Sequence, residues 1–300
     1  YGVRRFFRIV PPLYVALVLC AWVAVHWQSN MIEPTDMWGL ISHLLLISSF
    51  IPGEFESINA VFWTVIVECH FYAAYPLLWW MARKWSFLTI AFGTLVFGML
   101  YFVVASAAVP PGPVRVMLQH TVPALFWKWC LGVVLAEMWV NGRLPWLRSL
   151  LHVKWSLPVG LLAVFGGTFS SDDAIALQYK RFILPFGAFL LVGVFVFSGF
   201  SKFRSRFLEW SGLISYSIYL WHFPFLIWGG ALFKKLVNSP SVTLQVGFYI
   251  IGSLLFGWLM NRLIEMPVLW IRDSLFKESN PSSQSSHVRG NLPLGLYPSN

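Results

Sequence analysis

The stretch WTVIVECHFYAAYP, Trp63 to Pro76, lies in a run that is apolar enough to cross a membrane, yet it holds Glu68 and His70. A charged carboxylate near the centre of a bilayer costs roughly 3 kcal/mol on insertion scales. Such residues therefore usually face a protein interior or a water-filled cavity rather than lipid. The stretch predicts a membrane-spanning helix that carries a polar site.

The whole chain has the composition of a membrane protein. Of its 300 residues, 58% are hydrophobic and only 11% are charged, whereas soluble domains are about 25% charged. Continuous apolar runs of about 20 residues predict helices, because barrel strands would alternate apolar and polar residues. The 17 Trp and 10 Tyr residues suit the aromatic belts of bilayer interfaces. We expect an all-α polytopic membrane protein.

Eight apolar segments are long enough to span a bilayer. They lie at 11–28, 60–81, 86–108, 120–140, 155–170, 182–199, 212–232 and 243–263. The run 37–50 is too short, so we expect a re-entrant or interfacial helix there. Residues 1–277 are predicted to form one transmembrane domain, and residues 278–300, rich in Ser, Pro, Asn and Gly, a disordered tail.

The net charge of +9 is explained by topology. With Tyr1 in the cytoplasm, most of the 21 Lys and Arg residues fall in inner loops, as the positive-inside rule requires. This distribution makes nucleic-acid binding unnecessary as an explanation. Cys20, Cys69 and Cys130 lie in apolar runs without paired or metal-like spacing, so we expect small buried residues and no metal site.

The 60–81 segment carries a polar stripe. Its members recur at spacings of four, four and three, which places them on one helix face: Thr64, Glu68, Tyr72 and Tyr75. His70 is rotated about 200° from Glu68, so the two side chains point apart. Glu68 is either a buried acid that locks helix packing or an acid that lines a substrate cavity, and we favour the cavity. For His70 we favour packing.

A second stripe follows in WSGLISYSIYLWHFPF, Trp210 to Phe225. Its members again recur at spacings of four, four and three: Ser211, Ser215, Tyr219 and His222. A neutral imidazole in the middle of a span can act as an acid–base group or can tie helices together by a hydrogen bond. Both interpretations of His222 remain open.

The N-terminal RRFFRIVPP places Arg5 and Arg8 just before Pro11 and Pro12, which we expect to open a helix. The arginines are either topology anchors or a clamp for the phosphates of a nucleotide-like donor, because guanidinium binds phosphate in a bidentate way. No Gly-rich phosphate loop, HExxH, CxxC or GxSxG motif occurs. The templates of soluble enzymes therefore do not apply.

Five segments resemble, in order and spacing, the membrane acyltransferase family 3: RRFFRIVPPLY, INAVFWTVIVECHFYAAYPLL, LFWKWCLGVVLAEMW, WSGLISYSIYLWHFPF and IEMP. The resemblance implies an enzyme of the bacterial inner membrane that moves an acyl group from cytoplasmic acyl-CoA to a carbohydrate hydroxyl on the far side. Acetyl-CoA is the expected donor substrate, with no bound cofactor. A glycan or a lipid-linked sugar is the expected acceptor.

The resemblance also implies roles for particular residues. Arg5 and Arg8 match the family's Arg-x-x-Arg and would hold the donor, whereas Glu68 matches its acid and His222 its late histidine. Glu265-Met266-Pro267 matches its closing Glu-x-Pro. The expected site has Glu68 and His222 as catalytic residues in a cavity lined by Trp63, Thr64, Tyr72, Tyr75, Ser215 and Tyr219.

Two departures from the family pattern qualify this expectation. Cys69 and His70 replace the polar pair that usually follows the acid. The family's first two helices, which carry its presumed catalytic histidine, precede Arg-x-x-Arg and are not in this sequence. If the natural chain starts at Tyr1, the histidine that would remove the acceptor's proton is missing, and catalysis is expected to fail. A transporter or flippase is the alternative from another class, because polar stripes also line translocation paths.

Overall fold

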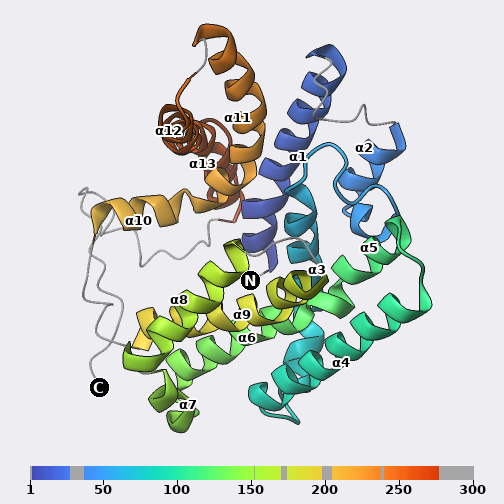
Figure 1. Ribbon diagram of the computed structural model, residues 1–300, viewed down its shortest axis with the longest axis vertical. Coiled ribbons are helices and arrows are strands. Elements are labelled where there is room, and N and C mark those ends of the chain that lie inside the picture. Colours follow the sequence, from blue (N-terminus) through green and yellow to red (C-terminus); the bar gives the residue numbers. More distant parts are fainter. Residues whose placement is uncertain are drawn as a thin grey trace.

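The computed structural model describes residues 2–27, 37–151, 153–169, 174–197, 205–237 and 240–276. Within these ranges the regular elements are all helical (Figure 1). The long helices are α1 (Gly2–Trp27), α3 (Phe62–Met81), α4 (Phe87–Ala108), α6 (Val122–Asn141), α8 (Val153–Phe169), α9 (Ala174–Phe197), α11 (Ser215–Leu236) and α12 (Val242–Met260). The short elements are α2 (Met37–Leu44), η1 (Ser48–Phe50), α5 (Pro113–His120), α7 (Pro145–Leu150), α10 (Arg206–Leu213), the π-helical η3 (Asn261–Glu265) and α13 (Met266–Leu275).

Each of the eight predicted segments thus overlaps a long helix, and the all-α class is confirmed. Five stretches are long and apolar enough to cross a membrane: Gly2–Val23, Phe87–Ala108, Pro113–Asn141, Lys180–Phe197 and Val242–Leu275. The remaining predicted spans stay predictions. Helices α3 and α11 are not among the five, and both carry polar stripes, which lower the average hydropathy of a helix. The chain is a multi-pass membrane protein, and the two polar stripes lie on long helices outside the five apolar stretches.

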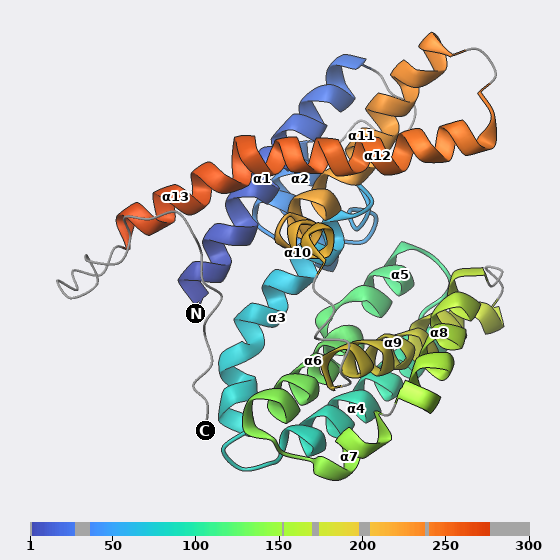
Figure 2. The ribbon, with the colours of Figure 1, turned by 90° about the vertical axis from the view of Figure 1, so that its left-hand side faces the viewer.

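The helices form two groups joined by α3. Figure 2 shows α1, α11, α12 and α13 in one half of the molecule and α4, α6, α8 and α9 in the other. Helix α11 packs on α12 in the first half, while α4 packs on α6 and α8 on α9 in the second. Helix α3 contacts both α1 and α6. Residues on α3 can therefore belong to sites in either half.

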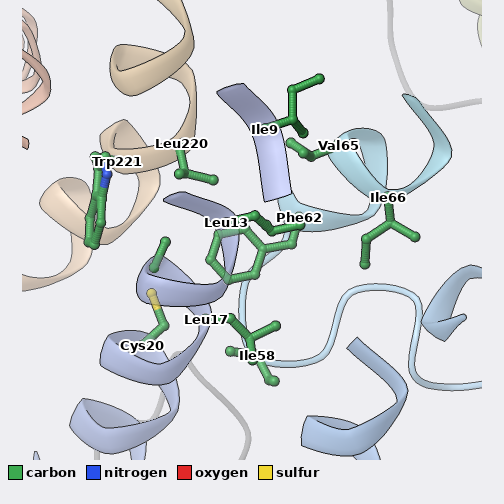
Figure 3. Packing of buried hydrophobic residues seen from close by; sticks show 11 residues of the cluster. Ile9, Leu13, Leu17, Cys20, Ile58, Phe62, Val65, Ile66, Leu220 and Trp221 are labelled. Atoms are coloured by element: carbon green, nitrogen blue, oxygen red, sulfur yellow. The ribbon is translucent and has the colours of Figure 1, made fainter. Parts of the chain in front are cut away.

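The main core holds α3 and α11 against α1. Leu13 and Leu17 of α1, four residues apart, lie on one helix face and are fully buried. They pack in one cluster with Phe62 of α3 and with Leu220 and Trp221 of α11 (Figure 3). This apolar contact brings the two polar stripes of the sequence next to one another.

The start of α1 differs from the prediction. The helix begins at Gly2, so Pro11 and Pro12 lie inside it and do not open it. A proline in a helix removes one backbone hydrogen bond, but membrane helices tolerate this because neighbouring groups re-satisfy the freed carbonyl. Arg5 and Arg8 consequently lie in the helix, three residues apart on one face.

The second polar stripe is also interrupted. The chain turns at Ile214, with φ −97° and ψ 7°, between α10 and α11. Ser211 therefore belongs to α10, where its hydroxyl donates to the carbonyl of Leu208. The prediction of one helix carrying all four polar residues is wrong, because the pattern of side chains does not reveal this backbone turn.

Three further predictions concern the short segment 37–50, the three cysteines and the C-terminal tail. Residues 37–50 form α2 and η1, which are too short to span. Cys20 and Cys130 are buried as predicted, but Cys69 is only half-buried, so that prediction was wrong for Cys69. Its side chain packs at the margin of the main apolar core. The predicted tail, 278–300, lies outside the described residues.

Candidate functional site

The two polar stripes meet at a hydrogen bond between hydroxyl groups. Thr64 of α3 and Tyr219 of α11, 155 residues apart in the chain, are joined through their side-chain oxygens. The ring centroid of His222 lies 5.7 Å from that of Tyr219. Thr64, Tyr219 and His222 therefore form one polar cluster between α3 and α11.

The hydrogen bonding of His222 defines its neutral tautomer. Its Nδ1 lies 2.6 Å from the carbonyl oxygen of Tyr219. A carbonyl oxygen can only accept, so Nδ1 carries the proton and donates it. The neutral ring then has its lone pair on Nε2. A half-buried imidazole with an unprotonated Nε2 is suited to accept a proton from a hydroxyl group.

Glu68 lies one helical turn from Thr64 on the same face of α3. The hydroxyl of Tyr72 donates to Oε1 of Glu68 at 2.6 Å. Glu68 also interacts electrostatically with the hydroxyls of Tyr219 and Tyr216 across the helix interface. The described residues place no donor on Oε2. One carboxylate oxygen is therefore held in place and the other remains available to a substrate hydroxyl.

Tyr72 connects this cluster to a basic cleft. The guanidinium carbon of Arg5 lies 5.5 Å from the centroid of the Tyr72 ring, a cation–π distance. Arg5, Tyr72 and Tyr75 line a cleft of about 630 Å³. Its wall also includes Trp79, Arg83, Trp129 and Arg143, of which Arg143 is paired with Glu137 at 2.8 Å. The cleft combines aromatic faces with cations, which suits a ligand that has both a ring and negative charge.

A second, larger cleft lies between the start of α1 and α13. It measures about 1080 Å³ and is lined by four arginines together with one acid: Arg4, Arg5, Arg8, Arg272 and Asp273. Asp273 accepts hydrogen bonds from Arg272 at 2.7 and 2.6 Å. Since Arg5 lines both clefts, they share a wall, and the larger one retains an excess of positive charge.

Arg8 is held by a buried carboxylate. Glu265, only 2% exposed, accepts hydrogen bonds from Ser217 at 2.6 Å and Asn261 at 2.8 Å. Nε of Arg8 lies 3.9 Å from the other carboxylate oxygen. Asn261 and Glu265 bound a π-helical turn, a distortion that is frequent at functional sites. Glu265 thus fixes the position of Arg8 at the edge of the larger cleft.

We expect Glu265→Gln to lower the free energy of unfolding by about 2 kcal/mol, the contribution of one hydrogen bond to a charged group. Ser217 and Asn261 both donate to Oε2, so a glutamine oxygen in that place still accepts from them, but as a neutral and weaker acceptor. The amide nitrogen replaces Oε1, and the ion pair with Arg8 is lost. Thermal unfolding in detergent measures the effect, with the exposed Glu56→Gln as matched control. Equal melting temperatures for the two variants would contradict a structural role for the carboxylate.

The remaining predicted residues lie away from this cluster. Ser215 is exposed and donates to the carbonyl of Gly212, so it does not reach the Thr64–Tyr219 contact. Trp63 contacts His120 of α5, with 5.2 Å between the two ring centroids. His70 bonds the carbonyl of Leu46 at 2.7 Å, which agrees with the packing interpretation. The stripe residues of α3 face the site, whereas these three do not.

Sequence reasoning missed the residues that support the arginines. Ser217 and Asn261 received no role, and Glu265 entered only through a family resemblance. The spacing of four between Asn261 and Glu265, inside an apolar segment, was the signal that could have found them, because residues four apart share a helix face. Arg272 was not assigned to the site, although it lines the larger cleft.

Comparison with known proteins adds independent findings. The family model described as "Acyltransferase domain" matches residues 1–262. The chain is 22% identical over 301 residues to the peptidoglycan O-acetyltransferase OatA of Listeria monocytogenes, covering 89% of this chain and 46% of that protein. It is 25% identical over 276 residues to the exopolysaccharide production protein ExoZ of Rhizobium meliloti, covering 87% of this chain and 78% of that protein.

A third relative is the putative peptidoglycan O-acetyltransferase YrhL of Bacillus subtilis, at 23% identity over 296 residues. The match covers 89% of this chain and 45% of that protein. The chain thus spans about half the length of the two O-acetyltransferases it matches. No solved structure matches the chain.

Proposed function

The chain belongs to the acyltransferase 3 family, and from that premise we propose that it transfers an acyl group to a hydroxyl of a glycan. The relatives' names support this class, since two of them name O-acetylation of peptidoglycan and one names exopolysaccharide production. The observation that carries the proposal is the cluster of Thr64, Tyr219 and His222 beside Glu68. It offers a proton acceptor and a carboxylate to a hydroxyl substrate.

The donor we propose is acyl-CoA, with acetyl-CoA as the simplest case. Arg4, Arg5, Arg8 and Arg272 line one cleft, and guanidinium groups are suited to bind phosphates. The adjoining aromatic cleft is lined by Arg5 and by Tyr72, whose hydroxyl donates to Glu68. We further propose that the N-terminus faces the cytoplasm of a bacterial inner membrane, which would place the arginine cleft on the side of the acyl-CoA pool.

In the proposed reaction the acceptor oxygen bonds to the acyl carbon and the carbon–sulfur bond of the thioester breaks. His222 takes the hydroxyl proton on Nε2 and passes it to the leaving thiolate, so the enzyme ends unchanged. Glu68 orients the hydroxyl through Oε2. A positioned general base typically contributes about 10²–10⁴-fold, and holding donor and acceptor together contributes further.

The test uses the protein in proteoliposomes with acetyl-CoA labelled in the acetyl group. Soluble peptidoglycan fragments and an exopolysaccharide fragment are offered on the opposite side, and mass spectrometry follows the label. We expect an O-acetylated glycan. A glycan that crosses the membrane unmodified would favour a transporter, and the absence of both labelling and crossing would indicate an inactive chain. Either result contradicts the proposal.

We expect Arg5→Lys to weaken acetyl-CoA binding by about tenfold, because lysine keeps the charge but cannot make a bidentate contact. The same change at Arg8 should have a similar effect and also loosens its contact with Glu265. Calorimetric titration of the purified protein measures donor affinity. Arg206→Lys, an exposed position on α10, is the matched control. Unchanged affinity in both cleft variants would leave these arginines as topology anchors.

A further inference from the structure

Two cations lie side by side within the second group of helices. Lys128 is six residues into α6 and Arg181 is seven residues into α9, or about 9–10 Å from the start of each helix. The two helices pack together, and the ring of Trp127 stacks on that of Phe182 at 6.1 Å. Each cation is the sequence neighbour of one of these rings, and the two charges interact electrostatically.

The surroundings of this pair are aromatic. The guanidinium carbon of Arg181 lies 4.2 Å from the centroid of Phe102, and Nζ of Lys128 lies 5.8 Å from that of Trp127. Nη1 of Arg181 is buried and has no hydrogen-bond partner. Within the described ranges no carboxylate forms an ion pair with either cation.

Without a bound ligand, this arrangement of two cations is energetically unfavourable. Charged side chains within membrane helices are expensive and usually mark substrate or ion pathways. Two like charges held close together in a medium of low dielectric repel one another. A buried guanidinium nitrogen without a partner adds a further desolvation cost. An anion bound between the two cations would offset all three costs: the buried charge, the repulsion and the unpaired nitrogen.

Aromatic contacts connect the pair to α3, the helix that carries Thr64 and Glu68. His120, at the end of α5, interacts electrostatically with both Lys128 and Arg181. Its ring lies 5.2 Å from that of Trp63, the residue next to Thr64. The pair shares no residue with the two arginine clefts. The pair is therefore separate from the proposed donor clefts, and His120 and Trp63 connect it to α3, the helix that carries Thr64 and Glu68.

We propose that Lys128 and Arg181 bind an anionic group, a carboxylate or a phosphate, of the acceptor glycan. This inference rests on the proposed function and specifies its substrate class. A carboxylate would come from an acidic sugar, and a phosphate from the carrier of a lipid-linked sugar. Either would be anchored by the cations while a neighbouring hydroxyl reaches Thr64, Tyr219 and His222.

The experiment measures binding by calorimetry without any donor, so a protein that cannot acylate still gives a result. Two probe pairs are used: a glucuronic-acid disaccharide with its methyl ester, and N-acetylglucosamine 1-phosphate with N-acetylglucosamine. We expect the anionic member of one pair to bind about 10- to 100-fold more tightly than its neutral partner, the effect of one charge-assisted hydrogen bond. The pair that shows the preference identifies the source of the anion.

The double variant Lys128→Gln, Arg181→Gln should lose this preference while neutral probes bind as before. Arg181→Lys, which keeps the charge, should retain most of it. The matched control is Lys235→Gln, which removes an exposed cation near the end of α11. A preference that survives in the double variant, or its absence from the parent protein in both pairs, would overturn the inference.

A melting experiment separates this role from a structural one. Removing two half-buried cations that have no acid partner among the described residues should leave the melting temperature of the double variant equal to, or above, that of Lys235→Gln. A clearly lower melting temperature, together with unchanged anion preference, would assign Lys128 and Arg181 to helix packing instead.

Discussion

Glu68→Gln is expected to reduce the turnover of acyl transfer by at least about 100-fold, while the variant still inserts into the membrane at the parental level. The substitution keeps the shape of the side chain and removes its charge. The amide can still accept from Tyr72 at one oxygen, but the second position becomes a donor and can no longer accept from the substrate hydroxyl. Losing one preorganised group of this kind typically costs about 10²–10³ in turnover.

Two comparisons isolate the charge of Glu68. Tyr72→Phe removes only the hydroxyl that holds Oε1, so it should lower turnover far less than Glu68→Gln. Glu56→Gln makes the same chemical change at an exposed position outside the long helices and should leave turnover unchanged. Membrane levels are followed by immunoblot. If Glu68→Gln transfers acyl groups at the parental rate, the carboxylate is a packing residue and the proposed site loses its acid.

His222→Gln should reduce turnover at saturating substrate by about 10²-fold or more. Glutamine forms hydrogen bonds, but it does not take up or release a proton at physiological pH. His222→Asn is the more informative companion. Its amide nitrogen takes the place of Nδ1 and can still donate to the carbonyl of Tyr219, so it preserves the local bond and removes only Nε2. Both variants should be inactive in the labelled acetyl-CoA assay.

A structural role for His222 predicts a different pattern. If the ring only ties the helix together, His222→Asn should behave like the parent protein, and His222→Gln should turn over almost normally but melt earlier in detergent. Hydrogen bonds within membrane proteins are worth about 0.6–2 kcal/mol, enough for a measurable shift. Near-normal turnover in either variant would move proton transfer to another group.

The sequence predicted the helices well because their cause is local. A bilayer of fixed thickness requires about 20 apolar residues, so the eight segments could be found by composition alone. The stripe of Thr64, Glu68 and Tyr72 was equally predictable, since residues four apart share a helix face whatever surrounds them. Two predictions of helix boundaries were wrong. Helix α1 begins before Pro11 rather than at it, and the turn at Ile214 separates Ser211 from the rest of the second stripe without a change in the polar pattern.

The contacts between helices were decided by the tertiary structure alone. No spacing within α3 or α11 indicates that Thr64 meets Tyr219, because many helix rotations and crossing angles bury equivalent apolar faces. The same holds for Glu265 and its partners Ser217 and Arg8, which come from three different helical segments. By itself the sequence determined which residues are polar within apolar helices. Packing decided which of them meet, since a contact depends on two surfaces at once and a periodic pattern describes only one.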